Sequence, residues 1–221
     1  MSNFPQELLD FYNKNIEFYN NTHESYALSA ADDGCAYYPI KFNFDTKLLL
    51  EECVSVDHLF FNHRSQDKKS GYGHRGWQSL TLHGIDKHKT EHYTKYGFNS
   101  LEEANYHWTD VCELIPNLYT FLNGLPYKLF ERVRIMRLDP GGYIMPHTDN
   151  NHKRTFSPLN IAINNPQGCH FVFKDIGIVP FEAGTGMILD VGREHIVVNN
   201  SAKTRYHVIV HGHYNNDFFN L

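Results

Sequence analysis

The sequence has no long apolar run. None of its segments approaches the roughly 20 apolar residues that a membrane-spanning helix needs. The N-terminal stretch MSNFPQELLDFYNKN carries acidic residues where a secretory signal would be apolar. We therefore expect a cytoplasmic protein that does not bind membranes.

Closely spaced cysteine pairs are also missing. The four cysteines, Cys35, Cys53, Cys112 and Cys169, contain no Cys-x-x-Cys spacing. This pattern favours reduced thiols over a disulfide framework or a cysteine-ligated zinc site.

An excess of basic residues is absent as well. The chain carries 20 Lys and Arg against 25 Asp and Glu, a formal net charge of −5. Nucleic acids and anionic membranes attract proteins through a basic surface that replaces counterions. We expect neither as a partner, and no pattern indicates an oligomeric state.

Glycine and proline are sparse, with 15 and 9 residues in a chain of 221, and no tract is of low complexity. A folded protein is predicted, and its length suits one domain. We expect a single domain over residues 1–221, in which 1–128 supply supporting helices and strands and 129–214 form the core. Sixteen Phe and fourteen Tyr favour a mainly β protein.

The first half of the chain shows mixed signals. Leu8, Tyr12 and Ile16 recur at helical spacing, and PNLYTFLNG at 116–124 begins with Pro and ends with Gly, as helices do. Ser100 and Glu103 match a capping box that predicts a helix carrying Trp108. Strands are expected at 57–62 and 76–84.

From residue 129 onward, short apolar runs alternate with turn sequences every 8 to 12 residues or so. The turn sequences include Asp-Pro-Gly-Gly at 139–142 and Asn-Asn-Pro-Gln-Gly at 164–168. The spacing predicts a double-stranded β-helix, a cupin-like jelly roll, built on eight strands. These are expected at 129–138, 143–149, 158–164, 169–174, 177–181, 186–190, 195–199 and 204–213.

A His-x-Asp tripeptide, His147-Thr148-Asp149, follows the Gly pair in GGYIMPHTDN. With 15 His in the chain, about one such tripeptide is expected by chance, so it needs further support. Residues i and i+2 of a strand share a face, and His195 precedes a β-branched run expected on the opposite sheet. Two His and one carboxylate on one side of an ion suit Fe(II) and leave coordination positions open.

Arg205 lies ten residues after His195, in the expected strand that contains Val208 and Val210. A buried guanidinium is costly unless it holds an anion, and its planar fork fits a carboxylate. His207 shares the strand face of Arg205. Ser157 and Asn160 are further candidates for hydrogen bonds to a co-substrate.

Several other cations and aromatics have two interpretations. Lys153 and Arg154 fit either a substrate contact or a solvated turn, and Trp77 fits either the core or the substrate approach. Arg134 and Arg137 lie on opposite faces of one expected strand, so at most one faces the cavity. His207, His211 and His213 suggest an alternative zinc site, but they span too great a length of strand to converge on one ion.

Three stretches carry a resemblance to a known family: RVRIMRLDPGGYIMPHTDN, SPLNIAINNPQGCHFVF and FEAGTGMILDVGREHIVVNNSAKTRYHVIV. Between residues 132 and 210 they resemble Fe(II)/2-oxoglutarate-dependent oxygenases. Within these, the chain is similar to the aspartyl/asparaginyl β-hydroxylase-like group, which includes bacterial proline cis-hydroxylases.

The resemblance implies that His147, Asp149 and His195 bind iron and that Arg205 holds the distal carboxylate of 2-oxoglutarate. It also implies a reaction in which O2 converts 2-oxoglutarate to succinate and CO2 while the substrate is hydroxylated. Asp149 makes the chain resemble the bacterial branch more than the animal branch, and it disfavours a halogenase.

The leading hypothesis is therefore a dioxygenase that hydroxylates an amino acid, either free or within a peptide or protein. Two alternatives remain on the residues alone. One is a cupin-like module that binds a metal and a small ligand without turnover, and the other is a zinc-dependent hydrolase or isomerase on the same barrel.

Overall fold

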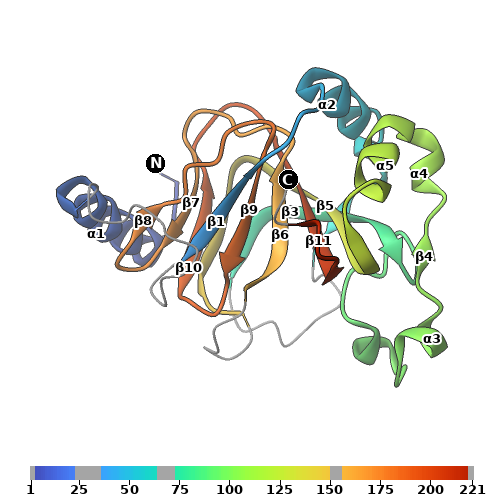
Figure 1. Cartoon of the computed structure of the whole chain (residues 1–221). Helices are drawn as coiled ribbons and strands as arrows, with labels where there is room; N and C mark the ends of the chain where they lie inside the picture. Colours follow the sequence, from blue (N-terminus) through green and yellow to red (C-terminus); the bar gives the residue numbers. More distant parts are fainter. Residues whose placement is uncertain (1–2, 23–35, 64–72, 150–155, 219–221) are drawn as a thin grey trace.

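The strands of this chain form a curled antiparallel sheet (Figure 1). The structure is a computed structural model that describes residues 3–22, 36–63, 73–149 and 156–218. Its main strand order is β1-β9-β6-β11-β5-β10-β7-β8, and β3 runs along the other edge of β5. This arrangement confirms the predicted mainly β jelly roll with a few supporting helices.

The bounds of the strands are as follows: β1 (Tyr37–Lys41), β2 (Phe61–Asn62), β3 (His74–Gly84), β4 (His107–Trp108), β5 (Tyr127–His147), β6 (Phe156–Ala162), β7 (Cys169–Phe173), β8 (Gly177–Ile178), β9 (Thr185–Asp190), β10 (His195–Asn199) and β11 (Arg205–Tyr214). The helices are α1 (Gln6–Thr22), α2 (Thr46–Ser55), α3 (Leu101–Ala104), α4 (Val111–Leu114) and α5 (Pro116–Asn123), with 3-10 turns η2 (Asp57–Leu59) and η3 (Tyr93–Tyr96). None of the described helices is long and apolar enough to cross a membrane.

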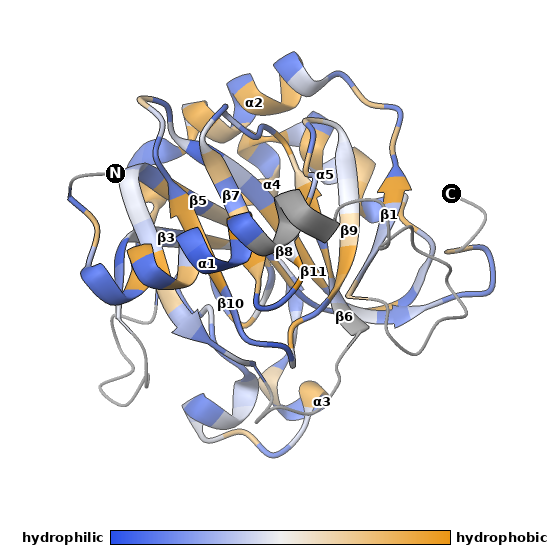
Figure 2. Cartoon of the chain, turned by 90° about the vertical axis from the view of Figure 1, so that its left-hand side faces the viewer, coloured by the Kyte–Doolittle hydropathy of each residue, from blue (hydrophilic) through white to orange (hydrophobic). Residues whose placement is uncertain are grey.

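Apolar side chains form three clusters, one between the two halves of the curled sheet and one on each outer face. Phe171, Phe173 and Val197 lie in the inner cluster. Helices α2, α4 and α5 cover one outer face through a second cluster. Helix α1 covers the other, and Figure 2 shows it lying across the strands with polar residues toward the viewer. The helices thus leave the inside of the curled sheet free for a site.

Strand β5 replaces two predicted strands and the turn between them. The sequence predicts a reversal at the Asp-Pro-Gly-Gly tetrapeptide, but β3 pairs with β5 on both sides of it, at Leu138 and at Tyr143. Gly141 has a φ of 69°, and the β3–β5 register shifts between Arg75 and Trp77. The tetrapeptide therefore bends one strand without reversing it. The part of β5 before the bend pairs with β11, and the part after the bend pairs with β10.

Other predicted boundaries differ in smaller ways. The helices at the N-terminus and at 116–124 are confirmed as α1 and α5, and the strand at 76–84 is confirmed within β3. Residues 57–62 hold η2 and the two-residue β2 in place of one strand, and only Gly177–Ile178 of the expected strand 177–181 is extended. Helix α2, which begins after the capping side chain of Asp45, was not predicted.

The capping box at Ser100 is confirmed, since its hydroxyl accepts a hydrogen bond from the Glu103 N–H at 3.1 Å. The predicted helix is nevertheless wrong in length. Asn105 adopts a left-handed φ of 50° that ends α3 after one turn. Trp108 lies in β4 instead, where it pairs with His83 of β3.

We predict that Gly142→Ala destabilises the fold by about 1–3 kcal/mol. A Cβ at Gly142 would lie 2.8 Å from the carbonyl oxygen of Asp139 and 2.9 Å from that of Arg75. Both contacts are with backbone atoms, and moving a paired backbone costs free energy. Urea unfolding measures the change. Gly141→Asn is the matched control, because Asn tolerates a left-handed φ and a Cβ there meets no atom within 4 Å. Equal stability of the two variants would show that the bend does not depend on this close backbone approach.

Candidate metal centre and its cavity

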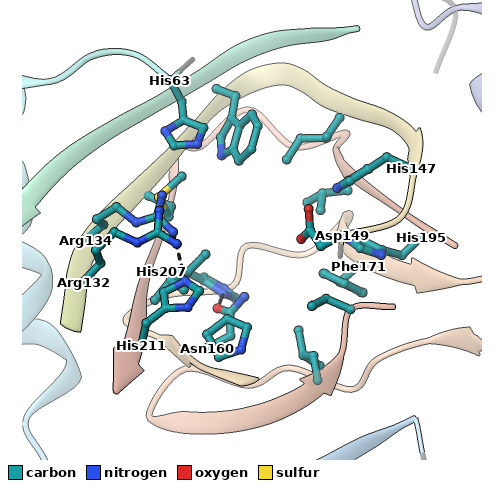
Figure 3. A pocket seen from close by; sticks show the side chains of 18 of the residues that line it. His63, Arg132, Arg134, His147, Asp149, Asn160, Phe171, His195, His207 and His211 are labelled. Atoms are coloured by element: carbon teal, nitrogen blue, oxygen red, sulfur yellow. Dashed lines mark hydrogen bonds between the residues drawn. The ribbon is translucent and has the colours of Figure 1, made fainter. Parts of the chain in front are cut away.

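A cavity of about 260 Å³ opens inside the curled sheet (Figure 3). Its residues come from strands far apart in the sequence, including β3, β5, β6, β7, β10 and β11. In the close-up, His147, Asp149 and His195 lie on one side of the cavity and Arg132 and Arg134 on the other. One wall of the cavity thus carries residues that commonly bind metals, and the opposite wall is basic.

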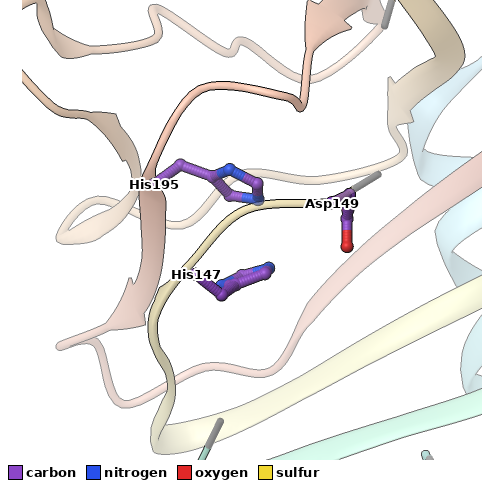
Figure 4. Close-up of side chains that lie close together, drawn as sticks. All are labelled: His147, Asp149 and His195. Atoms are coloured by element: carbon purple, nitrogen blue, oxygen red, sulfur yellow. The ribbon is translucent and has the colours of Figure 1, made fainter. Parts of the chain in front are cut away.

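His147 and His195 are brought together by direct strand pairing. His147 is the last residue of β5, His195 is the first residue of β10, and the two are partners in the β5–β10 register. Their ring centroids lie 4.1 Å apart (Figure 4). The expectation that His195 lies on the opposite sheet is wrong, because β10 is the immediate neighbour of the last part of β5.

Asp149 reaches the same place from outside the strand. β5 ends at His147, so the alternation of strand side chains does not place this carboxylate. Its backbone N–H donates to the carbonyl of Val191 at 2.8 Å, which ties the loop to the segment before β10. The ligand atoms of Asp149, His147 and His195 all lie within 4.8 Å of one another. This is the candidate metal group that the sequence predicts.

The two imidazoles are oriented by backbone carbonyls. His147 Nδ1 lies 2.8 Å from the carbonyl oxygen of Met145, and His195 Nδ1 lies 2.8 Å from that of Arg193. A carbonyl oxygen only accepts, so each Nδ1 carries a proton, and in the neutral imidazole Nε2 keeps its lone pair for a metal. Two neutral nitrogens and a carboxylate oxygen form a donor set that fits a divalent iron-type ion.

The surroundings of His195 keep it neutral. The residue is 3% exposed and its ring stacks on Phe171, with centroids 4.7 Å apart and an angle of 14° between the planes. Burial lowers the pKa of His195 below its ordinary value, and the hydrogen bond to Arg193 and the charge of Asp149 oppose this only in part. An imidazole that is neutral near neutral pH is ready to bind a metal.

Arg205, His207 and Asn160 form a second group in the cavity. Arg205 donates to His207 Nδ1 at 2.7 Å, and the same nitrogen lies 2.8 Å from Asn160 Oδ1. All three residues are buried. Burial, reinforced by the charge of Arg205, lowers the pKa of His207 well below its ordinary value, so the imidazole is neutral.

Two donor atoms of this group are left without a partner. Arg205 Nε and His207 Nε2 are buried and make no hydrogen bond to any described residue. An unsatisfied buried donor costs about 1–3 kcal/mol, and more when it is charged. Because a guanidinium only donates and His207 Nδ1 accepts from it, Nε2 carries the imidazole proton. The pair thus has two donor groups that could serve an anionic acceptor.

Of the other residues that the sequence suggested for the site, some line the cavity, one faces away from it, and some lie outside the described residues. Arg134 and Trp77 line the cavity, whereas Arg137 faces away and pairs with Asp139 at 2.9 Å. Ser157 belongs to β6, but its side chain lies outside the described residues, as do Lys153 and Arg154.

The alternative zinc site on β11 is not formed. His207 and His211 line the cavity, but His213 is exposed and lies 3.4 Å from Glu131. Within the part of the chain that the structure describes, these three histidines do not form a group that could hold a metal ion.

Three titratable residues of the cavity were not predicted: Arg132, His63 and Glu91. A signal for Arg132 was present, because it stands two residues before Arg134 and shares its strand face. His63 and Glu91 come from loops on either side of β3, and no sequence periodicity connects them with the site.

A jelly roll with such a donor group at its opening and a buried Arg-His pair inside defines a class: the 2-oxoglutarate-dependent oxygenases. The sequence model of the aspartyl/asparaginyl beta-hydroxylase family matches residues 45–213. The chain belongs to this family and is an enzyme of the 2-oxoglutarate-dependent oxygenase type. No curated protein sequence matches it.

A solved structure agrees with the fold. A prolyl hydroxylase from Trichoplax adhaerens, in complex with a peptide fragment of the hypoxia inducible factor oxygen degradation domain, superposes with a TM-score of 0.52 at 11% identity. The match covers 98% of this chain and 97% of that one. A prolyl-4-hydroxylase from Pseudomonas putida gives a TM-score of 0.44 at 16% identity and covers 82% of this chain and 94% of its own.

We predict that His147→Ala and His195→Ala each weaken Fe(II) or Mn(II) binding by more than about 100-fold, since even neighbours of metal ligands are worth about 10- to 100-fold. Calorimetric titration under nitrogen measures the affinity. His170→Ala is the control, because His170 lies outside the cavity and hydrogen-bonds Tyr12 at 2.7 Å. Retained metal affinity in either alanine variant would remove that imidazole from the metal group.

The free energy of unfolding of the metal-free protein should fall on acidification below pH 6.5. Burial lowers the pKa of His207 and His211 well below the ordinary 6.5, so the unfolded chain takes up protons there that the folded chain does not. Each contributes up to about 1.4 kcal/mol per pH unit between its folded pKa and 6.5, and nothing above 6.5. Urea unfolding in EDTA from about pH 7.5 to about pH 5.5 measures the slope.

His207→Gln should reduce this slope, whereas His107→Gln, a change at an exposed surface histidine, should not. An unchanged slope in the His207 variant would mean that this imidazole takes up its proton as readily in the folded protein as in the unfolded chain.

Proposed function

We propose that this protein is a dioxygenase that uses Fe(II), 2-oxoglutarate and O2 to hydroxylate an amino acid, either free or within a peptide or protein. The observation that carries the proposal is the presence in one cavity of two complementary groups. One is the His147, Asp149 and His195 donor set, and the other is the Arg205–His207 pair with its unsatisfied buried donors.

The donor set fits Fe(II) because it combines two neutral nitrogens with one carboxylate oxygen on one side of a shared point. Bound there, iron would supply the chemistry that activates O2. Each turnover then balances as follows. The 2-oxoglutarate loses CO2 and gains one oxygen atom to become succinate, and the other oxygen atom enters a substrate C–H bond as a hydroxyl group.

Arg205 would hold a carboxylate of 2-oxoglutarate. Its guanidinium is fixed by the hydrogen bond to His207 and lies over the Phe181 ring, 5.8 Å from the centroid. His207 would donate a second hydrogen bond from Nε2, and the side chain of Asn160 packs against the imidazole, 2.8 Å from Nδ1. Ser157 stays a candidate for a further hydrogen bond.

Apolar side chains between the two groups would keep water from the reacting atoms. Phe171, Val197 and Leu189 line the cavity and are nearly fully buried. A dry site strengthens the charge interactions of Arg205 and prevents side reactions of activated oxygen.

An amino acid or peptide substrate is supported by the family, whose description names aspartyl and asparaginyl residues. The Trichoplax adhaerens hydroxylase binds a peptide, and its likeness to this chain is one of fold. The three described cysteines, Cys53, Cys112 and Cys169, are free and buried, which supports a reducing compartment such as the cytoplasm.

Succinate release tests the proposal directly. Protein incubated with Fe(II), ascorbate, 2-oxoglutarate and O2 should form succinate, at least slowly, even without a second substrate. A module that only binds ligands would form none. A zinc-dependent hydrolase would be indifferent to both O2 and 2-oxoglutarate, so either result would overturn the oxygenase proposal.

We predict that Arg205→Ala raises the 2-oxoglutarate concentration needed for half-maximal turnover by roughly tenfold to 100-fold, because hydrogen bonds to charged groups contribute about 1.5–3 kcal/mol. Iron binding should be unchanged, which calorimetry checks separately. Arg205→Lys should recover only part of the affinity, since an ammonium lacks the planar fork. Wild-type dependence on 2-oxoglutarate in the alanine variant would show that Arg205 does not hold the co-substrate.

Asp149→Gly should keep some metal bound through the two imidazoles but lose hydroxylation, because the carboxylate charge helps to hold Fe(II). Metal titration and product analysis by mass spectrometry separate the two effects. Full hydroxylation by the glycine variant would exclude a ligand role for Asp149.

A further inference from the structure

Two arginines of β5 form the cavity wall that faces the metal group. Arg132 and Arg134 alternate with Val133, so both guanidiniums lie on the inner face while Val133 and Ile135 pack into the outer cluster. Figure 3 shows the two arginines across the cavity from His147 and Asp149. Neither arginine belongs to the metal group or to the Arg205 group.

The two guanidiniums are held in place by the surrounding chain. Arg134, which is 7% exposed, donates to the carbonyl of Thr90 at 2.9 Å and to His211 Nε2 at 3.1 Å. Arg132 donates to the same carbonyl at 3.4 Å. Burial and the two arginine charges lower the pKa of His211 well below its ordinary value, so the imidazole accepts a hydrogen bond without adding charge. Guanidiniums that are already ordered lose little entropy when they bind an anion.

The wall is basic. Among the described residues on this side of the cavity, Glu91 supplies a single carboxylate, and its Oε1 lies 3.6 Å from His63 Nε2. Two guanidiniums on one wall of the cavity attract an anion. A planar, two-oxygen acceptor such as a carboxylate matches the fork of an arginine.

This wall is separate from the anion site at Arg205. Arg205 pairs with Leu138 in the β5–β11 register, whereas Arg134 pairs with Ile209, four residues further along β11. At the rise of a strand, these positions are about 13 Å apart. The cavity therefore offers two separate sites for anions, and 2-oxoglutarate at Arg205 would leave the second one vacant.

We propose that Arg132 and Arg134 bind the carboxylate of the substrate that is hydroxylated, and that this substrate is a small free carboxylic acid, with free amino acids as the leading class. The inference rests on the proposed function, because it assigns the Arg205 site to 2-oxoglutarate. A cavity of about 260 Å³ lies below the range of about 300–1,000 Å³ typical of sites for drug-sized ligands, and it must also hold the co-substrate. A residue inside a peptide chain has no backbone carboxylate to offer this wall.

A carboxylate held at the far wall also orients the substrate. The end of the molecule away from the carboxylate then faces His147, Asp149 and His195 (Figure 3). The hydroxyl group is therefore added at a carbon other than the one that bears the carboxylate.

The test uses the full chain and two matched panels of compounds: the free L-amino acids and their primary carboxamides. Succinate formation is followed in the presence of Fe(II) and saturating 2-oxoglutarate, and mass spectrometry locates the hydroxyl group. At least one free acid should stimulate succinate formation well above the rate without substrate. The carboxamide of the same amino acid should be at least tenfold weaker.

Variants assign the effect to the wall. Arg132→Gln and Arg134→Lys should each raise the KM for the active acid by roughly tenfold or more. The Kd for 2-oxoglutarate, measured by calorimetry on the Mn(II)-loaded protein, should change less than about twofold. Arg137→Gln is the control, because it removes a guanidinium from the opposite face of the same strand, where Arg137 pairs with Asp139. It should leave both constants unchanged, and thermal unfolding confirms that each variant is folded.

Three outcomes would overturn the assignment. A carboxamide as active as its acid, or stimulation by no free acid while 2-oxoglutarate still binds, would mean that this wall does not select a free carboxylate. Loss of 2-oxoglutarate binding in the Arg132 and Arg134 variants would mean that it holds the co-substrate. If the wild-type protein neither binds 2-oxoglutarate nor forms succinate, the proposed oxygenase function is itself wrong, and the experiment does not reach the question of the substrate.

Discussion

The pairing of β5 with β10 is the constraint on which the site depends. His147 and His195 are opposite partners in this ladder, so their side chains emerge on the same face from adjacent strands. A slip of one residue in either strand would turn one imidazole to the other face. The register shift between His195 and Val197 lies directly beside the pair, and such irregularities commonly re-aim side chains next to active sites. A backbone hydrogen bond to Val191 then holds Asp149 close enough to complete the donor set.

One strand supplies both walls of the cavity. Arg132 and Arg134 precede the bend in β5, and His147 follows it. The bend has a left-handed φ at Gly141 and needs Gly142 for the close approach of two carbonyls. Since β3 pairs with β5 on both sides of the bend, the two walls are held by the same pair of strands. The spacing between metal group and basic wall is therefore a property of the fold, not of flexible loops.

Buried charge in the cavity follows a repeated pattern. Arg205 donates to His207, and Arg134 donates to His211, with both histidines on β11. A buried cation is stabilised when its hydrogen bonds are satisfied, but a carboxylate partner would also cancel the charge that attracts an anion. Neutral imidazoles accept the hydrogen bonds and leave the positive charge in place. This arrangement suits the two acids that we propose for the cavity, a co-substrate and a substrate.

The sequence by itself determined the kind of fold and the chemistry of the central residues. The alternation of short apolar runs with turn sequences predicted a jelly roll. Residue type and order predicted a donor set of His147, Asp149 and His195 with Arg205, and these residues line one cavity. Local patterns succeed there because strand alternation and turn chemistry act over a few residues. Boundaries were less predictable: Asp-Pro-Gly-Gly looked like a turn because no local signal reveals that β3 pairs across it.

Only the tertiary structure decided which side chains share the cavity. Strand pairing made His195 a neighbour of His147, and the bend in β5 placed Arg132 and Arg134 across from them. Glu91 and His63 joined the site from loops that no periodicity connects with it. These contacts join residues distant along the chain, and they arise when the sheet curls and buries its inner face, a step that depends on the whole core at once.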